Sequence, residues 1–231
     1  MTLLEAIQTR HSVRKYMDCP IPEETLVTLR NKVWEINRES GLNIQLVTEE
    51  PKAFKGLFIS SYGQFSGVKN YLVMAGPKGK DMEEKTGYFG EELVLLAQTL
   101  GLNSCWVGLT YKKIPGAFTL RETDAIHCVI AIGFGESQGS GHQVKSVSDV
   151  SNASDLTPEW FRKGVEAALL APTAVNQQKF RFEYLGFKDG GKRPKVSAKS
   201  LFTMIGYGRI DLGIAKYHFE LGSGKENFEW A

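Results

Sequence analysis

The sequence contains few cysteines and histidines, and neither residue type forms a pattern that binds a metal. Its three cysteines are odd in number and lack Cys-X-X-Cys spacing, which is typical of free thiols in a reducing compartment. The four histidines form no His-X-X-X-His or His-X-His pair and do not combine with the cysteines into a zinc signature. We therefore expect neither a disulfide framework nor a structural metal.

The chain also lacks a long apolar run and an excess of either charge. No run approaches the roughly 18 apolar residues that a membrane span requires, and the first residues include Glu5 and lack a signal-peptide core. The 28 basic and 26 acidic residues leave a net charge of +2, which gives no drive toward nucleic acid. With 231 residues, the chain is long enough to bury a core. We expect a cytoplasmic enzyme with no membrane or nucleic-acid partner.

Hydrophobic spacing predicts alternating helices and strands in the first 150 residues. Thr2 and Glu5 have capping-box spacing, which favours a helix over residues 1–15. Pro22 opens a second helix that Gly41 ends, and residues 43–47 alternate as a strand. The further predicted elements are loop and short helix at 51–67, strands at 71–75 and 128–132, a central helix at 91–100 and a polar connector at 137–154.

The pattern begins again after the connector. A helix is expected from Pro158 to Leu170 and a strand over residues 179–185. This helix start and this strand lie 136 residues after their counterparts in the first part of the chain. Further along, a Gly-Tyr pair and a serine lie 119 residues after theirs. This order favours a degenerate internal duplication over coincidence, with residues 1–150 as the first half and 151–231 as the second.

Two candidate sites lie in the first half. Arg10, Ser12 and Arg14 place two guanidinium groups and a hydroxyl close together, which suits a phosphate; the alternative is a solvated charged turn. Residues 101–108 set small residues around Trp106, so that backbone can approach a flat ligand; the alternative is a helix end followed by a core strand. Cys105 has no basic neighbour, so a nucleophilic role has little support.

Two further candidates lie in or after the connector. Residues 171–180 run from Ala-Pro through small and amide side chains, whose donors and acceptors suit a heterocycle; the alternative is a polar helix–strand connection. Lys145 adds a positive charge that suits a phosphate, although an exposed linker lysine explains it nearly as well.

Together these segments resemble the nitroreductase family of FMN enzymes. The resemblance is carried by four stretches: TRHSVRKY, GYFGEELVLLAQTLGLNSCWVG, CVIAIGFGE and APTAVNQQKF. It implies an α+β fold, with helices around a central mixed β-sheet and FMN in a crevice shared between two halves. The FMN-binding residues implied by the resemblance are Arg10, His11, Ser12, Arg14, Trp106, Val107, Gly108, Lys145, Pro172, Thr173, Ala174 and Asn176.

The sequence departs from the family pattern at two places. The Ala-Pro-small-small-X-Asn segment normally follows the second helix, near residues 36–41, but here it lies in the second half. Gln143 stands where the family tends to carry a second basic residue. The first departure predicts that one chain supplies both sides of a single flavin site, as a monomer that mimics a dimer or as a homodimer.

The resemblance implies an oxidoreductase that passes electrons from NAD(P)H to a small acceptor such as a nitroaromatic or a quinone. The flavin would perform the redox chemistry, so no catalytic acid or base is expected. Two alternatives stay open at this point: a flavin carrier or sensor without turnover, and a different FMN reaction on the same fold.

Overall fold

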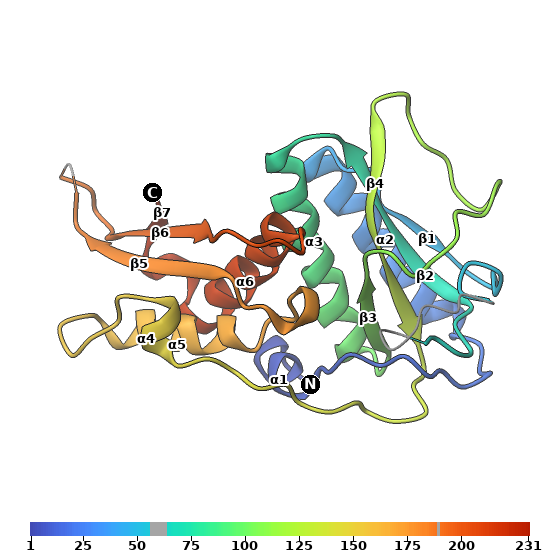
Figure 1. Ribbon diagram of the computed structural model, residues 1–231, viewed down its shortest axis with the longest axis horizontal. Coiled ribbons are helices and arrows are strands. Elements are labelled where there is room, and N and C mark those ends of the chain that lie inside the picture. The colour runs from blue at the N-terminus through green and yellow to red at the C-terminus, as the bar shows by residue number, and fades with distance from the viewer. Residues whose placement is uncertain (56–63, 189) are drawn as a thin grey trace.

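The computed structural model describes residues 1–55, 64–188 and 190–231, which form an α+β fold with two sheets (Figure 1). The helices are α1 (Leu3–Thr9), α2 (Glu23–Ser40), α3 (Lys80–Thr99), α4 (Val147–Val150), α5 (Glu159–Leu169) and α6 (Gly208–Ser223). The strands are β1 (Gln45–Val47), β2 (Asn70–Pro77), β3 (Asn103–Val107), β4 (Asp124–Gly133), β5 (Phe180–Gly186), β6 (Lys195–Ser200) and β7 (Glu229–Trp230). The short 3-10 turns are η1 (Ala174–Asn176) and η2 (Lys225–Asn227).

The larger sheet has the order β1-β2-β4-β3 and is antiparallel throughout. Its two inner strands are apolar on both faces, because each face is covered. Leu72 and Met74 of β2 face the core shared with α2 and α3, whereas Tyr71 and Val73 pack into a second cluster on the opposite face. The mixed pairing that the resemblance implied occurs in the smaller sheet, β5-β6-β7, where β6 and β7 are parallel.

Helices α3 and α6 lie side by side at the centre of the molecule, between the two sheets (Figure 1). Their backbones approach closely at two glycines. A Cβ atom at Gly87 would lie 1.9 Å from the carbonyl oxygen of Ile210, and one at Gly213 would lie 2.0 Å from that of Glu84. Because neither contact leaves room for a side chain, glycine is required at both positions. The close approach joins the two halves into one core.

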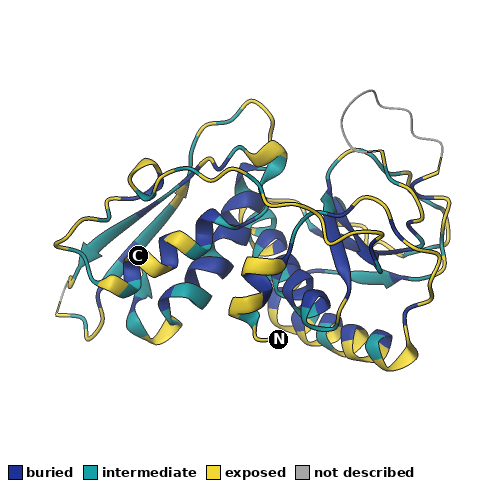
Figure 2. Cartoon of the chain, turned by 90° about the horizontal axis from the view of Figure 1, so that it is seen from below, coloured by how far each residue is buried: buried dark blue, intermediate teal, exposed yellow. Residues whose placement is uncertain are grey.

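The second half buries an aromatic cluster between α5, α6 and the smaller sheet. Phe182 and Phe219 stack with ring centroids 4.7 Å apart, and Phe161 and Trp230 also pack against Phe219. Figure 2 shows dark, buried residues along the central helices and exposed residues along the outer face of α2. Within the residues that the structure describes, no helix is long and apolar enough to cross a membrane.

The structure confirms the α+β class and corrects several predicted boundaries. The helix predicted for residues 1–15 ends at Thr9, where Arg10 turns to an extended conformation with φ −71° and ψ 121°. Residues beyond it pair with neighbouring segments instead, since Val13 N–H donates to the Ser104 carbonyl at 3.0 Å. The helix predicted at 91–100 begins earlier, at Lys80, and the connector 137–154 contains the short helix α4. Part of the segment predicted at 51–67 lies outside the described residues.

Both halves contain elements in the order helix, strand, strand, helix. In the first half the order is α2, β1, β2, α3, and in the second it is α5, β5, β6, α6. Helices α2 and α5 both begin after a proline in extended conformation, Pro22 and Pro158, as the offset of 136 requires. This shared order supports the duplication, which stays a prediction.

Candidate functional site

A cavity of about 310 Å³ lies between the two halves and has a mainly apolar wall. This main cavity falls within the size range of small-molecule sites. Residues predicted from both halves line it. They are Ser12, Arg14, Trp106, Val107, Gly108, Pro172, Thr173 and Ala174.

The segment after α1 forms the first wall. Ser12 pairs with Ser104 as an isolated parallel bridge, which places the segment beside the beginning of β3. Arg14 is exposed, lines the main cavity, and forms no ion pair with any residue that the structure describes. Because guanidinium groups bind anionic oxygens strongly, the end of the cavity at Arg14 and Ser12 is chemically suited to an anionic group.

Strand β3 forms the second wall at residues 106–108. The Trp106 indole is turned toward α3, where its Nε1 donates to Glu91 Oε2 at 3.0 Å and its ring lies against Gly90. A Cβ atom at Gly108 would lie 2.5 Å from the phenol of Tyr207, so a larger residue there would displace the Tyr207 ring. Tyr207 therefore packs directly on the backbone of this wall.

The segment 172–178 forms the third wall and is held in an unusual conformation. Val175, Asn176 and Gln178 all have positive φ, with values of 48°, 55° and 44°. Positive φ is rare for a β-branched residue such as Val175 and costs free energy. Such conformations persist only where surrounding contacts enforce them, and they concentrate at binding sites.

Asp211 of α6 provides two of these contacts, to residues beside those with positive φ. Its Oδ1 accepts from the backbone N–H of Ala174 at 3.0 Å, and its Oδ2 accepts from Gln177 Nε2 at 2.6 Å. The side chain is buried and lines the main cavity. Burial raises the pKa of Asp211 to about 6, although both hydrogen bonds oppose the shift. Asp211 therefore fixes the third wall and is the acidic group of the cavity.

Arg10 lies behind the main cavity in a buried polar network. Its Nε is 3.9 Å from Glu91 Oε1, and both residues are almost fully buried. Glu91 also accepts from His218 Nε2 at 2.8 Å, while His218 Nδ1 lies 3.1 Å from the Ala167 carbonyl. Two Arg10 nitrogens, Nε and Nη1, lack a hydrogen-bond partner among the described residues. The network links α1, α3 and α6 directly behind the Trp106 indole.

The remaining predicted residues do not line the main cavity. His11 lies half-buried next to Ser12, and burial lowers its pKa. Lys145 Nζ donates to the carbonyl oxygens of Gln177 and Gln178 at 3.0 and 2.9 Å. Asn176 Nδ2 donates to the Gln143 carbonyl at 2.8 Å. Lys145 and Asn176 therefore join the third wall to the connector.

Cys105 lines the cavity but is buried, and burial raises the pKa of its thiol. A protonated, buried thiol is a poor nucleophile.

Sequence reasoning missed the part of the cavity that α6 and the loop before it supply. These residues are Ile205, Tyr207, Ile210, Asp211 and Ile214. A signal was present, because Asp211 lies among the apolar residues Ile210, Leu212 and Ile214, and buried acids need partners. The loop before α6 also carries Phe202 and Met204, which are 87% and 92% exposed.

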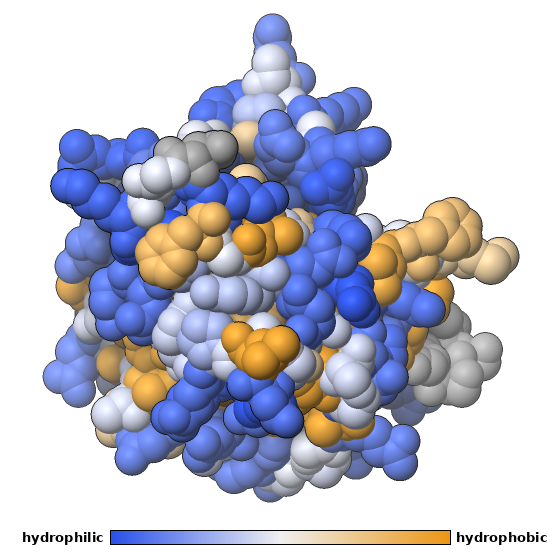
Figure 3. All heavy atoms as spheres, turned by 90° about the vertical axis from the view of Figure 1, so that its left-hand side faces the viewer, coloured by the Kyte–Doolittle hydropathy of each residue, from blue (hydrophilic) through white to orange (hydrophobic). Residues whose placement is uncertain are grey.

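Figure 3 shows a mostly hydrophilic face from which one apolar segment projects.

Comparison with known proteins identifies the family. The family described as "Putative TM nitroreductase" matches residues 2–223, so the chain belongs to it. No curated protein matches the chain.

Solved structures share the fold. A "putative nitroreductase" from Thermotoga maritima is 22% identical, with a TM-score of 0.63 over 98% of this chain and 85% of that one. A nitroreductase family protein from Clostridium difficile is 17% identical, with a TM-score of 0.51 over 67% of this chain and 99% of that one. A "putative nitroreductase" from Desulfovibrio desulfuricans, crystallised with FMN, is also 17% identical, with a TM-score of 0.51 over 68% of this chain and 99% of that one.

Proposed function

We propose that this chain is an FMN-dependent oxidoreductase that passes electrons from NAD(P)H to a small acceptor such as a nitroaromatic or a quinone. The observation that carries the proposal is the main cavity, because eight residues predicted to contact FMN line one space. Family membership supports an oxidoreductase. The structural relative crystallised with FMN supports the choice of cofactor.

The residues of the main cavity fit FMN in charge and shape. Arg14 offers a guanidinium without an ion pair in the described structure, which suits the phosphate. The apolar side chains of Ile205, Ile210 and Ile214 suit a flat aromatic ring system. Gly108 lines the main cavity beside the Tyr207 phenol that packs on it.

Bound FMN would supply the redox chemistry, accepting a hydride from the nicotinamide and delivering electrons to the acceptor. The chain's own residues would bind the cofactor and orient it. Asp211 holds the N–H of Ala174 and the Gln177 amide, and so fixes the third wall against α6. Tyr207 packs on Gly108 and limits the width of the cavity on the opposite side. The apolar wall excludes water from the reacting groups.

Steady-state oxidation of NADH and NADPH by the FMN-loaded protein tests the proposal. We expect oxidation that depends on an added nitroaromatic or quinone and is lost when FMN is removed. A folded protein that binds FMN but oxidises neither nucleotide with any acceptor would contradict turnover and favour a flavin carrier. A matched protein without FMN controls for direct reaction between donor and acceptor.

A further inference from the structure

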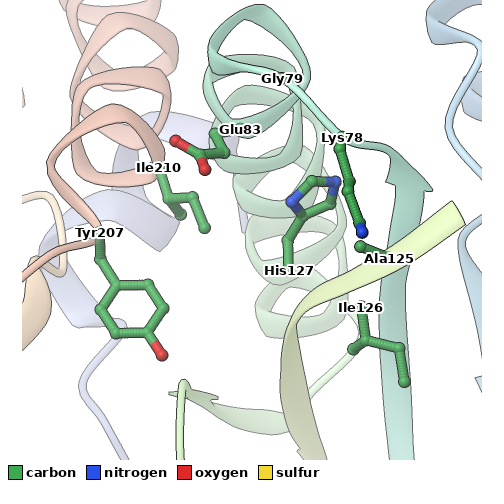
Figure 4. Close-up of a pocket in the computed structure, with 8 residues that line it drawn as sticks. All are labelled: Lys78, Gly79, Glu83, Ala125, Ile126, His127, Tyr207 and Ile210. Atoms are coloured by element: carbon green, nitrogen blue, oxygen red, sulfur yellow. The ribbon is translucent and has the colours of Figure 1, made fainter.

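A second cavity, also of about 310 Å³, adjoins the main cavity (Figure 4). This side cavity lies between the start of α3, strand β4 and the start of α6. Tyr207 and Ile210 line both cavities and form the boundary between them. A ligand that occupies both cavities would therefore pass the side chains of Tyr207 and Ile210.

Charged and polar side chains enter the side cavity from two elements. Figure 4 shows Lys78 and Glu83 extending from the two sides of Gly79, with the His127 ring between them. None of these three residues lines the main cavity. The proposed FMN site therefore leaves this polar cavity without a role.

The backbone of β4 is irregular where it supplies His127. Met74 pairs with Cys128 and Ala75 pairs with Ile126, so His127 is the extra residue of a β-bulge. Bulges redirect side chains and often occur beside functional sites. The His127 Nε2 atom is buried and has no hydrogen-bond partner among the described residues. An unpaired buried nitrogen is costly unless a ligand or water satisfies it.

The side cavity contains both basic and acidic side chains, which restricts the kinds of ligand that can bind there. Lys78 and His127 can donate to phosphate oxygens. Glu83 can only accept while it is ionised, which suits sugar hydroxyl groups and repels a second phosphate. A nucleoside with a ribose diol and a phosphate satisfies both kinds of group, whereas an inorganic anion leaves Glu83 opposed to it.

We propose that the side cavity binds the adenosine-phosphate half of NADH while the nicotinamide ring occupies the main cavity. In this arrangement Lys78 and His127 contact the diphosphate and Glu83 accepts from the adenosine ribose hydroxyls. The carboxylate of Glu83 would oppose the extra 2′-phosphate of NADPH, so the site favours NADH. The inference rests on the proposed function, because it assigns the electron donor of that reaction.

Binding of ADP-ribose, which lacks the nicotinamide ring, tests the side cavity directly. Calorimetry with the FMN-loaded parent should show binding, and Lys78→Ala and His127→Ala should each weaken it by about tenfold. Lys80→Ala is the matched control, because Lys80 is an exposed lysine near Lys78 that does not line the cavity. Absence of ADP-ribose binding by the parent, or parent affinity in both variants, would overturn the inference.

Steady-state kinetics with two electron donors provide a second test. Reduced nicotinamide riboside carries the reacting ring but lacks the phosphates and the adenosine. Lys78→Ala should raise KM for NADH by about tenfold, without a matching rise for the short donor. Glu83→Gln should improve the use of NADPH relative to NADH. An equal rise in KM for both donors would contradict the assignment.

The two proposals fail in distinguishable ways. A parent protein that oxidises neither donor contradicts the proposed function, whereas ADP-ribose binding still reports on the side cavity. A parent that oxidises both donors, with Lys78→Ala and His127→Ala unchanged, contradicts only the side-cavity assignment.

Discussion

Arg10 and Arg14 are four positions apart, yet their side chains occupy different environments. Arg10 is 3% exposed and faces the buried carboxylate of Glu91, so it belongs to the core that joins α1 to α3 and α6. Arg14 is exposed and lines the main cavity. The change follows from the helix end at Thr9, which takes the next residues out of helical register. Replacing Arg14 by an uncharged residue should therefore weaken ligand binding without destabilising the fold.

Arg14→Ala should weaken FMN binding by about ten- to a hundredfold, because a charge-assisted contact to phosphate is worth roughly 1.5–3 kcal/mol. Lys15→Ala is the matched control, since Lys15 is an exposed neighbour that does not line the cavity. Flavin fluorescence during titration measures both affinities. Equal affinity in the Arg14 variant, the control and the parent would show that Arg14 is only part of a solvated turn.

Asp211 should make the stability of the protein depend on pH. Its folded pKa of about 6 lies above the usual value of 3.8, so burial penalises the ionised form. The resulting contribution to stability is fully present below pH 3.8 and is lost as pH rises through about 6. Asp211→Asn removes this loss, while all other ionisable groups remain.

The free energy of unfolding of Asp211→Asn, minus that of the parent, should therefore increase from pH 4 to pH 7. The increase should be on the order of 2–3 kcal/mol, from about 1.4 kcal/mol per pKa unit. Urea denaturation at several pH values measures it. A difference that is constant over this range would show that Asp211 has an ordinary pKa in the folded protein.

At the scale of elements, the α3–α6 contact holds in place the helix that lines one side of the main cavity. Gly213→Ala would place a methyl group against the backbone of Glu84, which cannot move away like a flexible side chain. We expect a loss of about 1–3 kcal/mol in the free energy of unfolding, as for other overpacked cores. Arg209→Ala on the same helix removes only a partly exposed ion pair and should cost less than about 1 kcal/mol.

Chemical denaturation of both variants compares these costs. A Gly213→Ala variant as stable as Arg209→Ala would mean that the helices separate at little cost. The close approach would then not hold α6 in place beside the cavity.

Elements with strong local signals could be predicted from the sequence, and those set by distant contacts could not. Pro22 and Pro158 mark helix starts because proline lacks the backbone N–H that a helix interior needs, and each helix begins at the next residue. The end of α1 was missed because residues 10–15 keep helical spacing, whereas the structure pairs Val13 and Ser12 with Ser104. Strand β7 has only two residues and forms only through pairing with β6.

The candidate site shows the same division. Ser12, Arg14 and Gly108 could be predicted because local segments matched a family pattern, and they line the main cavity. Tyr207 and Asp211 could not, because their role depends on how α6 packs against residues far away in the chain. The unpaired nitrogen of His127 likewise arises from a β-bulge that only strand pairing reveals.

At the scale of the whole molecule, residues from both parts of the chain line the main cavity. Ser12, Arg14 and Gly108 come from the first half, and Ala174 and Asp211 come from the second. Neither half contains both sets, since the first lacks the Ala-Pro segment and the second lacks an Arg-His-Ser-Val-Arg segment. The predicted duplication would account for this division of the cavity between the two parts of the chain.

The most direct test of this account is an equilibrium titration of the full-length protein with FMN, monitored by flavin absorbance and fluorescence. The account predicts tight, non-covalent binding that saturates at one FMN per chain. It also predicts the flavin spectrum of a buried, apolar site, and weaker binding in the Arg14→Ala variant. Absence of binding by the folded protein, or saturation at two FMN per chain, would contradict it.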